Sequence, residues 1–229
     1  MFTPSRAARA LYALASALLL FGLALGRGDG RNRIPLPLRM LSSALVLLAA
    51  QLLAHGQPSR ERRMIAVGMS CGTLGDMFMA RVIPVPEHVL CGMASFGVGH
   101  GLYIGALASK GIRSGPRWHR ALRAGLGAGW LVGLLGWWAL IRSPRTPPRL
   151  TYGGLAYALL LGSMGGTAAA LAASDPRQRA RAAGAGLFLA SDILLAGELF
   201  RDLHFPSSGD AVWLIYIAGQ MLIVGDEEL

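Results

Sequence analysis

The sequence predicts an all-α integral membrane protein, whose single domain over residues 1–229 is a polytopic bundle of eight transmembrane helices. Hydrophobic residues make up 53% of the chain and charged residues only 15%, and the mean hydropathy is +0.47. Apolar runs of roughly 17 to 22 residues, about enough to cross the hydrocarbon core of a bilayer, recur along the chain. The charged residues gather in short blocks between these runs.

The first apolar run, residues 8–25, follows Arg6 and Arg9 and resembles the start of a signal peptide. Because further spans follow it, we expect it to remain as an uncleaved first helix. The other seven helices are expected over residues 38–55, 64–80, 88–109, 122–141, 152–173, 182–200 and 211–224.

Three of these helices are followed by prolines, which interrupt helical structure. Pro58 follows the second run, Pro84 and Pro86 follow the third, and Pro144 follows the fifth. Proline cannot continue a helix without losing a backbone hydrogen bond, so each of these positions marks a connection between spans. A basic loop over residues 110–120 separates the fourth run from the fifth.

The distribution of Arg and Lys predicts the orientation in the membrane. Eight spans place both termini on one side, and the loops on that side contain more Arg and Lys residues than the opposite loops. The positive-inside rule therefore predicts cytoplasmic termini, and we expect a multi-pass protein of a bacterial inner membrane. The formal charge of +10 comes from these loops. Because they contain no nucleic-acid-binding motif, the expected partner is the lipid bilayer and not a nucleic acid.

Two aspartates lie inside apolar segments that resemble each other. Asp76 lies in GMSCGTLGDMFMA, residues 68–80, and Asp192 lies in GAGLFLASDILLA, residues 184–196, with an offset of 116 residues. An aspartate near the middle of a membrane helix costs about 2.5–3.5 kcal/mol on insertion scales, so such a residue usually has a function. The two segments predict one shared site and suggest two parallel four-helix halves.

Further polar side chains are expected at a similar depth. His100 and Tyr103 in GVGHGLY are three residues apart and so share a helix face. The other candidates are Ser191, Tyr216, Gln220 and, at the entrance of the second helix, Arg39. Two structural alternatives remain open: these groups serve only as hydrogen-bond partners between helices, or one aspartate forms an ion pair with Arg39.

Two carboxyl groups in one buried site should not ionise equally, because burial and mutual repulsion disfavour the second charge. One acid then stays protonated while the other acts as a base, which suits hydrolysis of an acid-labile bond. The letters GMSCG at residues 68–72 lie inside the third expected helix and so form no GxSxG nucleophile elbow, and the chain has no HExxH or glycine-rich phosphate motif. Cys71 and Cys91 fit no metal or redox pattern, so we expect no metal and no cofactor.

These segments resemble the YhhN family, also called the lysoplasmalogenase family, of eight-helix membrane proteins. The resemblance covers most of the chain and is carried by Gly75-Asp76, by His100 and Tyr103, by Ser191-Asp192, and by Tyr216 with Gln220. The chain departs from the family pattern at Met40, where a proline is usual, and at Gly72, where a serine is usual.

The resemblance implies hydrolysis of the vinyl ether bond of lysoplasmalogens, which gives a fatty aldehyde and glycerophosphoethanolamine or glycerophosphocholine. It implies that Asp76 and Asp192 are the acid and base pair. Supporting side chains would be His100, Tyr103, Tyr216, Ser191 and Gln220, and Arg39 would bind the lipid phosphate. Two other functions stay open, a small proton-coupled transporter with broken helices, and a scaffold that tolerates Asp→Asn changes.

Overall fold

The computed structural model describes residues 4–27, 30–115 and 117–225, and within these ranges the chain forms eight α-helices and no strand. The helices are α1 (Pro4–Leu25), α2 (Leu36–Gly56), α3 (Arg60–Met79), α4 (His88–Ile112), α5 (Arg117–Gly136), α6 (Pro148–Ser174), α7 (Arg179–Arg201) and α8 (Ser208–Val224). A π-helical turn, Trp137–Ile141, extends α5, and a 3₁₀ turn, Pro176–Gln178, precedes α7. The all-α class and the order of the eight predicted helices are confirmed.

Six of these helices are long and apolar enough to cross a membrane, counting α5 together with its π-helical turn. The other two are α3 and α8. The first turn of α3 is the charged stretch Arg60–Arg63, and α8 has 17 residues. The structure therefore supports a multi-pass membrane protein with six clear spans, and the count of eight stays a prediction.

Several helices begin before their predicted first residue. Helix α3 begins at Arg60, four residues before the expected residue 64, because the Ser59 hydroxyl accepts a hydrogen bond from the Arg62 N–H at 3.0 Å. Helix α6 begins at Pro148 because the fixed backbone of proline suits the first helical turn. Hydropathy marks the apolar part of a helix, whereas capping decides where its backbone begins.

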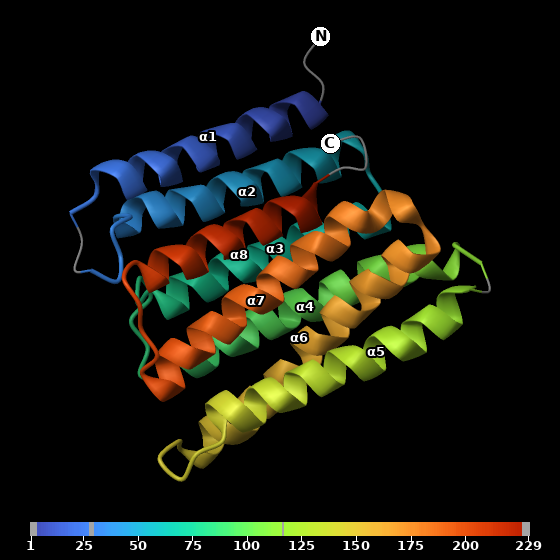
Figure 1. The fold of residues 1–229 in the computed structure, drawn as a ribbon. Coiled ribbons are helices and arrows are strands. Elements are labelled where there is room, and N and C mark those ends of the chain that lie inside the picture. The colour runs from blue at the N-terminus through green and yellow to red at the C-terminus, as the bar shows by residue number, and fades with distance from the viewer. Residues whose placement is uncertain (1–3, 28–29, 116, 226–229) are drawn as a thin grey trace.

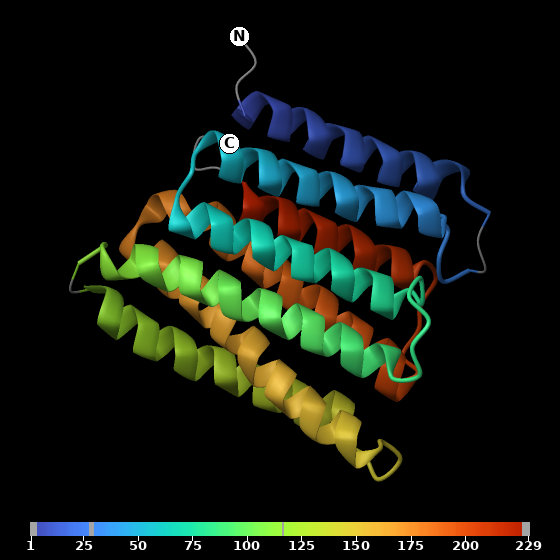
Figure 2. The ribbon, with the colours of Figure 1, turned by 180° about the vertical axis from the view of Figure 1, so that it is seen from behind.

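The eight helices form one bundle in which α1 and α5 lie at opposite edges (Figure 1). Helix α1 packs on α2, α3 on α4, α5 on α6, and α7 on α8. Helix α8 also contacts α2 and α3, so it lies between α3 and α7, the helices that carry the two aspartates. Figure 2, from the opposite side, shows α3 and α4 in front of α8 and α7, and α4 also contacts α6. This arrangement brings distant parts of the chain together at the centre of the bundle.

Helix α5 is attached to the bundle through glycine. A Cβ atom at Gly125 would collide with the backbone oxygen of Gly166, and one at Gly129 would collide with that of Gly162. Small residues of this kind let two membrane helices approach closely. The large apolar side chains of α5 that remain exposed are Trp130, Leu131, Val132, Leu134 and Leu135. Apart from its glycine face, α5 therefore suits contact with lipid.

Both ends of α8 are fixed by hydrogen bonds to other segments. At its start, the buried Asp210 carboxylate accepts hydrogen bonds from the backbone N–H groups of Arg33 at 2.7 Å and Ile34 at 3.0 Å. At its end, the Arg62 guanidinium donates to the Val224 carbonyl oxygen at 3.1 Å, and the Arg181 guanidinium donates to the Gly225 carbonyl oxygen at 3.4 Å. These contacts hold the polar residues of α8 at a defined height between α3 and α7.

Candidate active site

Asp76 lies where three helices meet and is only 3% exposed. Its Oδ2 atom accepts hydrogen bonds from Ser43 Oγ on α2 at 2.6 Å and from the Tyr216 hydroxyl on α8 at 3.0 Å. Ser43 Oγ also lies 3.1 Å from Thr73 Oγ1. Two hydroxyl donors therefore satisfy this buried carboxyl group, as a polar group away from water requires.

A second layer of polar side chains supports Tyr216. The Gln220 amide donates to the Tyr216 hydroxyl at 3.2 Å, and the Gln220 carbonyl oxygen accepts from the Tyr103 hydroxyl at 2.9 Å. Gly72 leaves room for this amide, since a Cβ atom there would lie 3.0 Å from Gln220 Nε2. Three of the predicted supporting residues, Tyr103, Tyr216 and Gln220, thus form one hydrogen-bonded chain that ends at Asp76.

Asp192 has a different partner, Tyr157 of α6. The Tyr157 hydroxyl donates to Asp192 Oδ2 at 2.5 Å and lies 3.2 Å from His100 Nε2 on α4. Because the single hydroxyl proton goes to the carboxylate, Nε2 of His100 is the donor in the second contact. Tyr157 was not among the predicted site residues, since it lies in an apolar run with no recognisable motif.

Aromatic rings connect the two aspartate networks. The centre of the Phe188 ring lies 4.7 Å from the centre of the His100 ring and 5.2 Å from the centre of the Tyr216 ring, and both pairs are edge-to-face. Phe96 contacts Phe188 and Tyr216 in the same geometry, at 6.1 and 6.0 Å. These rings join the Asp76 and Asp192 networks through ring contacts, and one shared site for the two acids stays a prediction.

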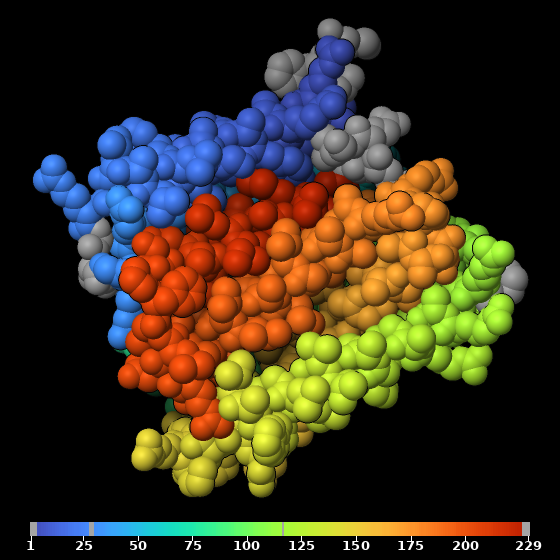
Figure 3. Space-filling model, viewed as in Figure 1, coloured from blue at the N-terminus to red at the C-terminus, as the bar shows by residue number. Residues whose placement is uncertain are grey.

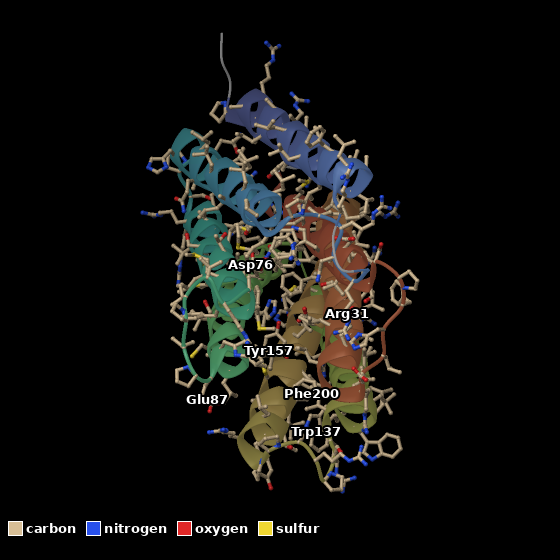
Figure 4. All side chains as sticks on the ribbon, turned by 90° about the vertical axis from the view of Figure 1, so that its left-hand side faces the viewer. Arg31, Asp76, Glu87, Trp137, Tyr157 and Phe200 are labelled. Carbon is tan, nitrogen blue, oxygen red and sulfur yellow. The ribbon has the colours of Figure 1, made fainter. Side chains whose placement is uncertain are left out.

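A cavity of about 90 Å³ lies beside Asp192. Asp192 and Tyr157 line it, together with apolar residues of α3 to α7 and of the π-helical turn. Figure 3 shows the surface hollowed between α7 and α5, and Figure 4 shows Tyr157 between Asp76 and the end of the bundle that carries Trp137. Since one water needs roughly 10–15 Å³ of such space, the cavity has room for several.

The two aspartates differ in their access to this cavity. Asp192 lines it, whereas Asp76 is not among the lining residues. Phe96 lines the cavity, and its ring lies against Gly75 and Tyr216 on the side of Asp76. Phe96 therefore separates the cavity from the Asp76 network.

Two predicted residues make contacts away from the carboxyl groups. Ser191 Oγ donates to the Phe188 carbonyl oxygen of its own helix at 2.7 Å. Arg39 donates to Asn32 Oδ1 at 2.9 Å, and its guanidinium carbon lies 5.9 Å from the centre of the Trp213 ring. Since hydroxyl groups are the hydrogen-bond donors to both aspartates, the geometry gives no support to the alternative ion pair with Arg39.

The site contains no evident metal ligand cluster. In residues 4–27, 30–115 and 117–225, no group of three or more His, Cys, Asp or Glu side chains is arranged to hold a metal ion. The two cysteines, Cys71 and Cys91, are free and partly buried.

These features define a multi-pass helical protein of the membrane type, with a buried acid, Asp76, and a partly buried acid, Asp192, which lines an apolar cavity. The model of the YhhN family matches residues 38–226, which is most of the chain. The chain therefore belongs to the YhhN family, as its sequence motifs predicted. No curated protein and no solved structure matches it significantly.

Proposed function

We propose that the protein is a lysoplasmalogenase-type hydrolase that cleaves the vinyl ether bond of lysoplasmalogens inside the membrane. The observation that carries the proposal is the position of Asp192, a carboxyl group held by Tyr157 at the wall of an otherwise apolar cavity. An amphiphilic single-chain lipid has its acid-labile bond next to its hydrocarbon chain and would fit such a place. Membership of the YhhN family supports a hydrolase as the class of enzyme.

The reaction needs one acid and one base. A carboxylic acid protonates the alkenyl carbon that is not bonded to oxygen, and the π electrons form the new C–H bond. The neighbouring carbon becomes an oxocarbenium centre, which water attacks while the second carboxylate takes a proton from it. The hemiacetal then breaks its bond to the glycerol oxygen, which receives a proton as the hemiacetal hydroxyl loses one. The products are a fatty aldehyde and a glycerophospho alcohol.

In this proposal Asp192 is the carboxyl group next to the vinyl ether, because it lines the cavity. Asp76 is the second member of the pair. Because the Phe96 ring lies against Gly75 and Tyr216 at the edge of the cavity, this ring has to turn aside before Asp76 can reach the attacking water. Tyr157 and His100 orient Asp192, while Tyr216, with Gln220 and Tyr103 behind it, orients Asp76. The phosphate contact of Arg39 and the supporting role of Ser191 stay predictions.

The transporter alternative required interrupted helices around the buried acids. The two helices that carry them are continuous, α3 over Arg60–Met79 and α7 over Arg179–Arg201. No observation on the described part of the chain favours transport.

Aldehyde release from a lysoplasmalogen by purified protein tests the proposal. We expect release by the wild type, and a loss of about 100-fold or more in Asp192→Asn and Asp76→Asn, as for removal of a general acid or base. Asp202→Asn is the matched control, because this aspartate lies just after α7 and its side chain is 91% exposed.

Two results would contradict the proposal. If the folded wild type releases no aldehyde from substrates with either the ethanolamine or the choline headgroup, the protein acts on another substrate. If both Asn variants keep their activity while folded, the two carboxyl groups do not form the acid and base pair. Size-exclusion profiles and melting curves of each variant establish that it is folded.

A further inference from the structure

We propose that the cavity beside Asp192 is the binding site for the single hydrocarbon chain of an amphiphilic lipid, which enters sideways between α5 and α7. The inference rests on the proposed function for the reaction that follows binding. Binding of the chain itself can be measured without any reaction, so the two proposals can fail separately.

The lining of the cavity suits hydrocarbon and little else. Apart from Asp192 and Tyr157, all of its lining residues are apolar, aromatic or glycine. The one other polar atom among their side chains, the indole N–H of Trp137, already donates to the Thr151 carbonyl oxygen at 2.8 Å. A polar ligand would lose its hydrogen bonds to water along this wall without replacing them, whereas an alkyl chain has none to lose.

One wall of the cavity follows α7 beyond the candidate catalytic acid. The lining residues of this wall run from Asp192 through Leu195, Ala196 and Leu199 to Phe200, at spacings that keep them on one helix face. Eight residues of helix correspond to about 12 Å. This wall can therefore accompany several methylene groups of a chain whose reactive end lies at Asp192.

The cavity reaches the lateral surface of the bundle. Val132 of α5 and Ile193 and Leu199 of α7 all line it, and each is more than 40% exposed. Figure 3 shows the hollow between these two helices from outside. Because the exposed side chains at this opening are apolar, and both helices qualify as membrane spans, the opening faces the interior of the bilayer.

The opening is closed at one end by a contact between α7 and the π-helical turn. Arg201 at the end of α7 donates from Nε to the Ala139 carbonyl oxygen at 2.9 Å and from Nη2 to the Arg142 carbonyl oxygen at 3.0 Å. Away from this contact, α5 packs mainly on α6. A chain can therefore pass between α5 and α7 without first breaking the bundle.

Two glycines of α5 provide a matched test. Gly136 lines the cavity, and a Cβ atom built there meets no atom within 4 Å, so a leucine at this position has room to occupy the cavity. Gly127 lies on the same helix with equally open space, but it does not line the cavity. Gly136→Leu and Gly127→Leu thus add the same side chain to the same helix, and only the first is expected to block the chain.

The probe is a lysophospholipid with a long saturated ether chain, which has no vinyl ether bond to cleave. Its binding to the protein in lipid nanodiscs is measured by titration calorimetry. We expect the wild type and Gly127→Leu to bind alike and Gly136→Leu to bind about tenfold more weakly or worse, since single methylene groups in a tight apolar pocket already change binding by that order. Ala196→Leu, from the α7 wall, should weaken binding in the same way.

Different results would contradict the chain site and the proposed reaction. Equal binding by Gly136→Leu and Gly127→Leu, both folded, or no binding by the wild type, would overturn the chain site even if aldehyde release were observed. Binding that depends on Gly136 and Ala196, together with no aldehyde release, would instead leave the chain site standing and contradict the proposed reaction.

Discussion

Tyr157 is the residue that connects His100 to the carboxyl group at the cavity. Its hydroxyl is the hydrogen-bond donor to Asp192, and His100 in turn fixes that hydroxyl. A group that orients a catalytic carboxylate affects the chemical step more than substrate binding. We therefore expect Tyr157→Phe to lower kcat for aldehyde release by about 100-fold with little change in KM.

Steady-state kinetics with a lysoplasmalogen measures both constants. Tyr152→Phe is the control, since Tyr152 lies on the same helix and is 70% exposed. A purely structural role for Tyr157 would lower the melting temperature and leave kcat of the folded fraction unchanged, which would remove Tyr157 from the proposed mechanism.

The sequence identified the two aspartates because a charge in an apolar run is conspicuous, but it could not identify their partners. Tyr157 is one tyrosine in a long apolar helix, and only the rotation of α6 about its axis turns its hydroxyl toward Asp192. Ser191 was predicted as a supporting residue from the family resemblance, in which it is paired with Asp192. Adjacent residues of a helix point about 100° apart, and the Ser191 hydroxyl instead bonds within its own helix.

Glycine-mediated contacts recur at the level of the helices. Besides the contact of α5 with α6, Gly68 of α3 lies against Gly99 of α4, and Gly184 of α7 lies against Gly219 of α8. In each contact an added Cβ atom would come within 3.2 Å of a backbone oxygen on the other helix. Close packing of this kind leaves no volume for even one methyl group without movement of a whole helix.

Gly129→Ala tests this packing. The new Cβ atom would collide with the Gly162 carbonyl oxygen, so α5 must shift away from α6, and overpacking of this kind costs about 1–3 kcal/mol. The melting temperature in detergent should fall. Gly127→Ala, where the Cβ atom enters open space, should leave it unchanged or raise it. Equal melting temperatures of the two variants would show that α5 does not depend on this contact.

The number, order and type of the helices could be predicted because hydropathy and proline positions report them directly. Their exact beginnings depended on local features such as the Ser59 cap and Pro148. The π-helical turn at Trp137–Ile141 had no signal in the sequence. It arises at the end of α5, where the Arg201 side chain binds the carbonyl oxygens of Ala139 and Arg142, and this contact joins residues about 60 positions apart.

The division into two parallel halves stays a prediction. Some contacts between helices recur in both predicted halves. Helix α1 packs on α2 as α5 packs on α6, and α2 meets α8 as α6 meets α4. Asp76 and Asp192 each follow, by eight residues, a glycine that contacts the next helix, Gly68 and Gly184. In such an arrangement, the two acids approach each other from equivalent positions in the two halves.

The link between the first and last parts of the chain passes through Asp210. Its replacement by alanine removes the acceptor of the backbone N–H groups of Arg33 and Ile34. Ile34 is buried, and an unsatisfied buried N–H group costs about 1–3 kcal/mol. We expect Asp210→Ala to lower the melting temperature and to speed proteolysis in the loop between α1 and α2. Asp202→Asn, at an exposed carboxylate, should do neither.

Limited proteolysis followed by mass spectrometry locates the cleavage sites. Unchanged protection of the loop between α1 and α2 in folded Asp210→Ala would contradict the anchoring role of this carboxylate.

The pairing of α3 with α8 determines how the protein can be assembled. Neither helix meets the length and composition of a clear span, and Asp76 on α3 takes one of its two hydroxyl donors from Tyr216 on α8. During synthesis, α3 leaves the ribosome more than 100 residues before that donor does. Until α8 is made, α3 with its Asp76 must therefore stay near the insertion machinery, or pack against α2, where the Ser43 hydroxyl can donate to Asp76. Completion of the polar centre waits for the last helix, so membrane insertion and the final folding step coincide.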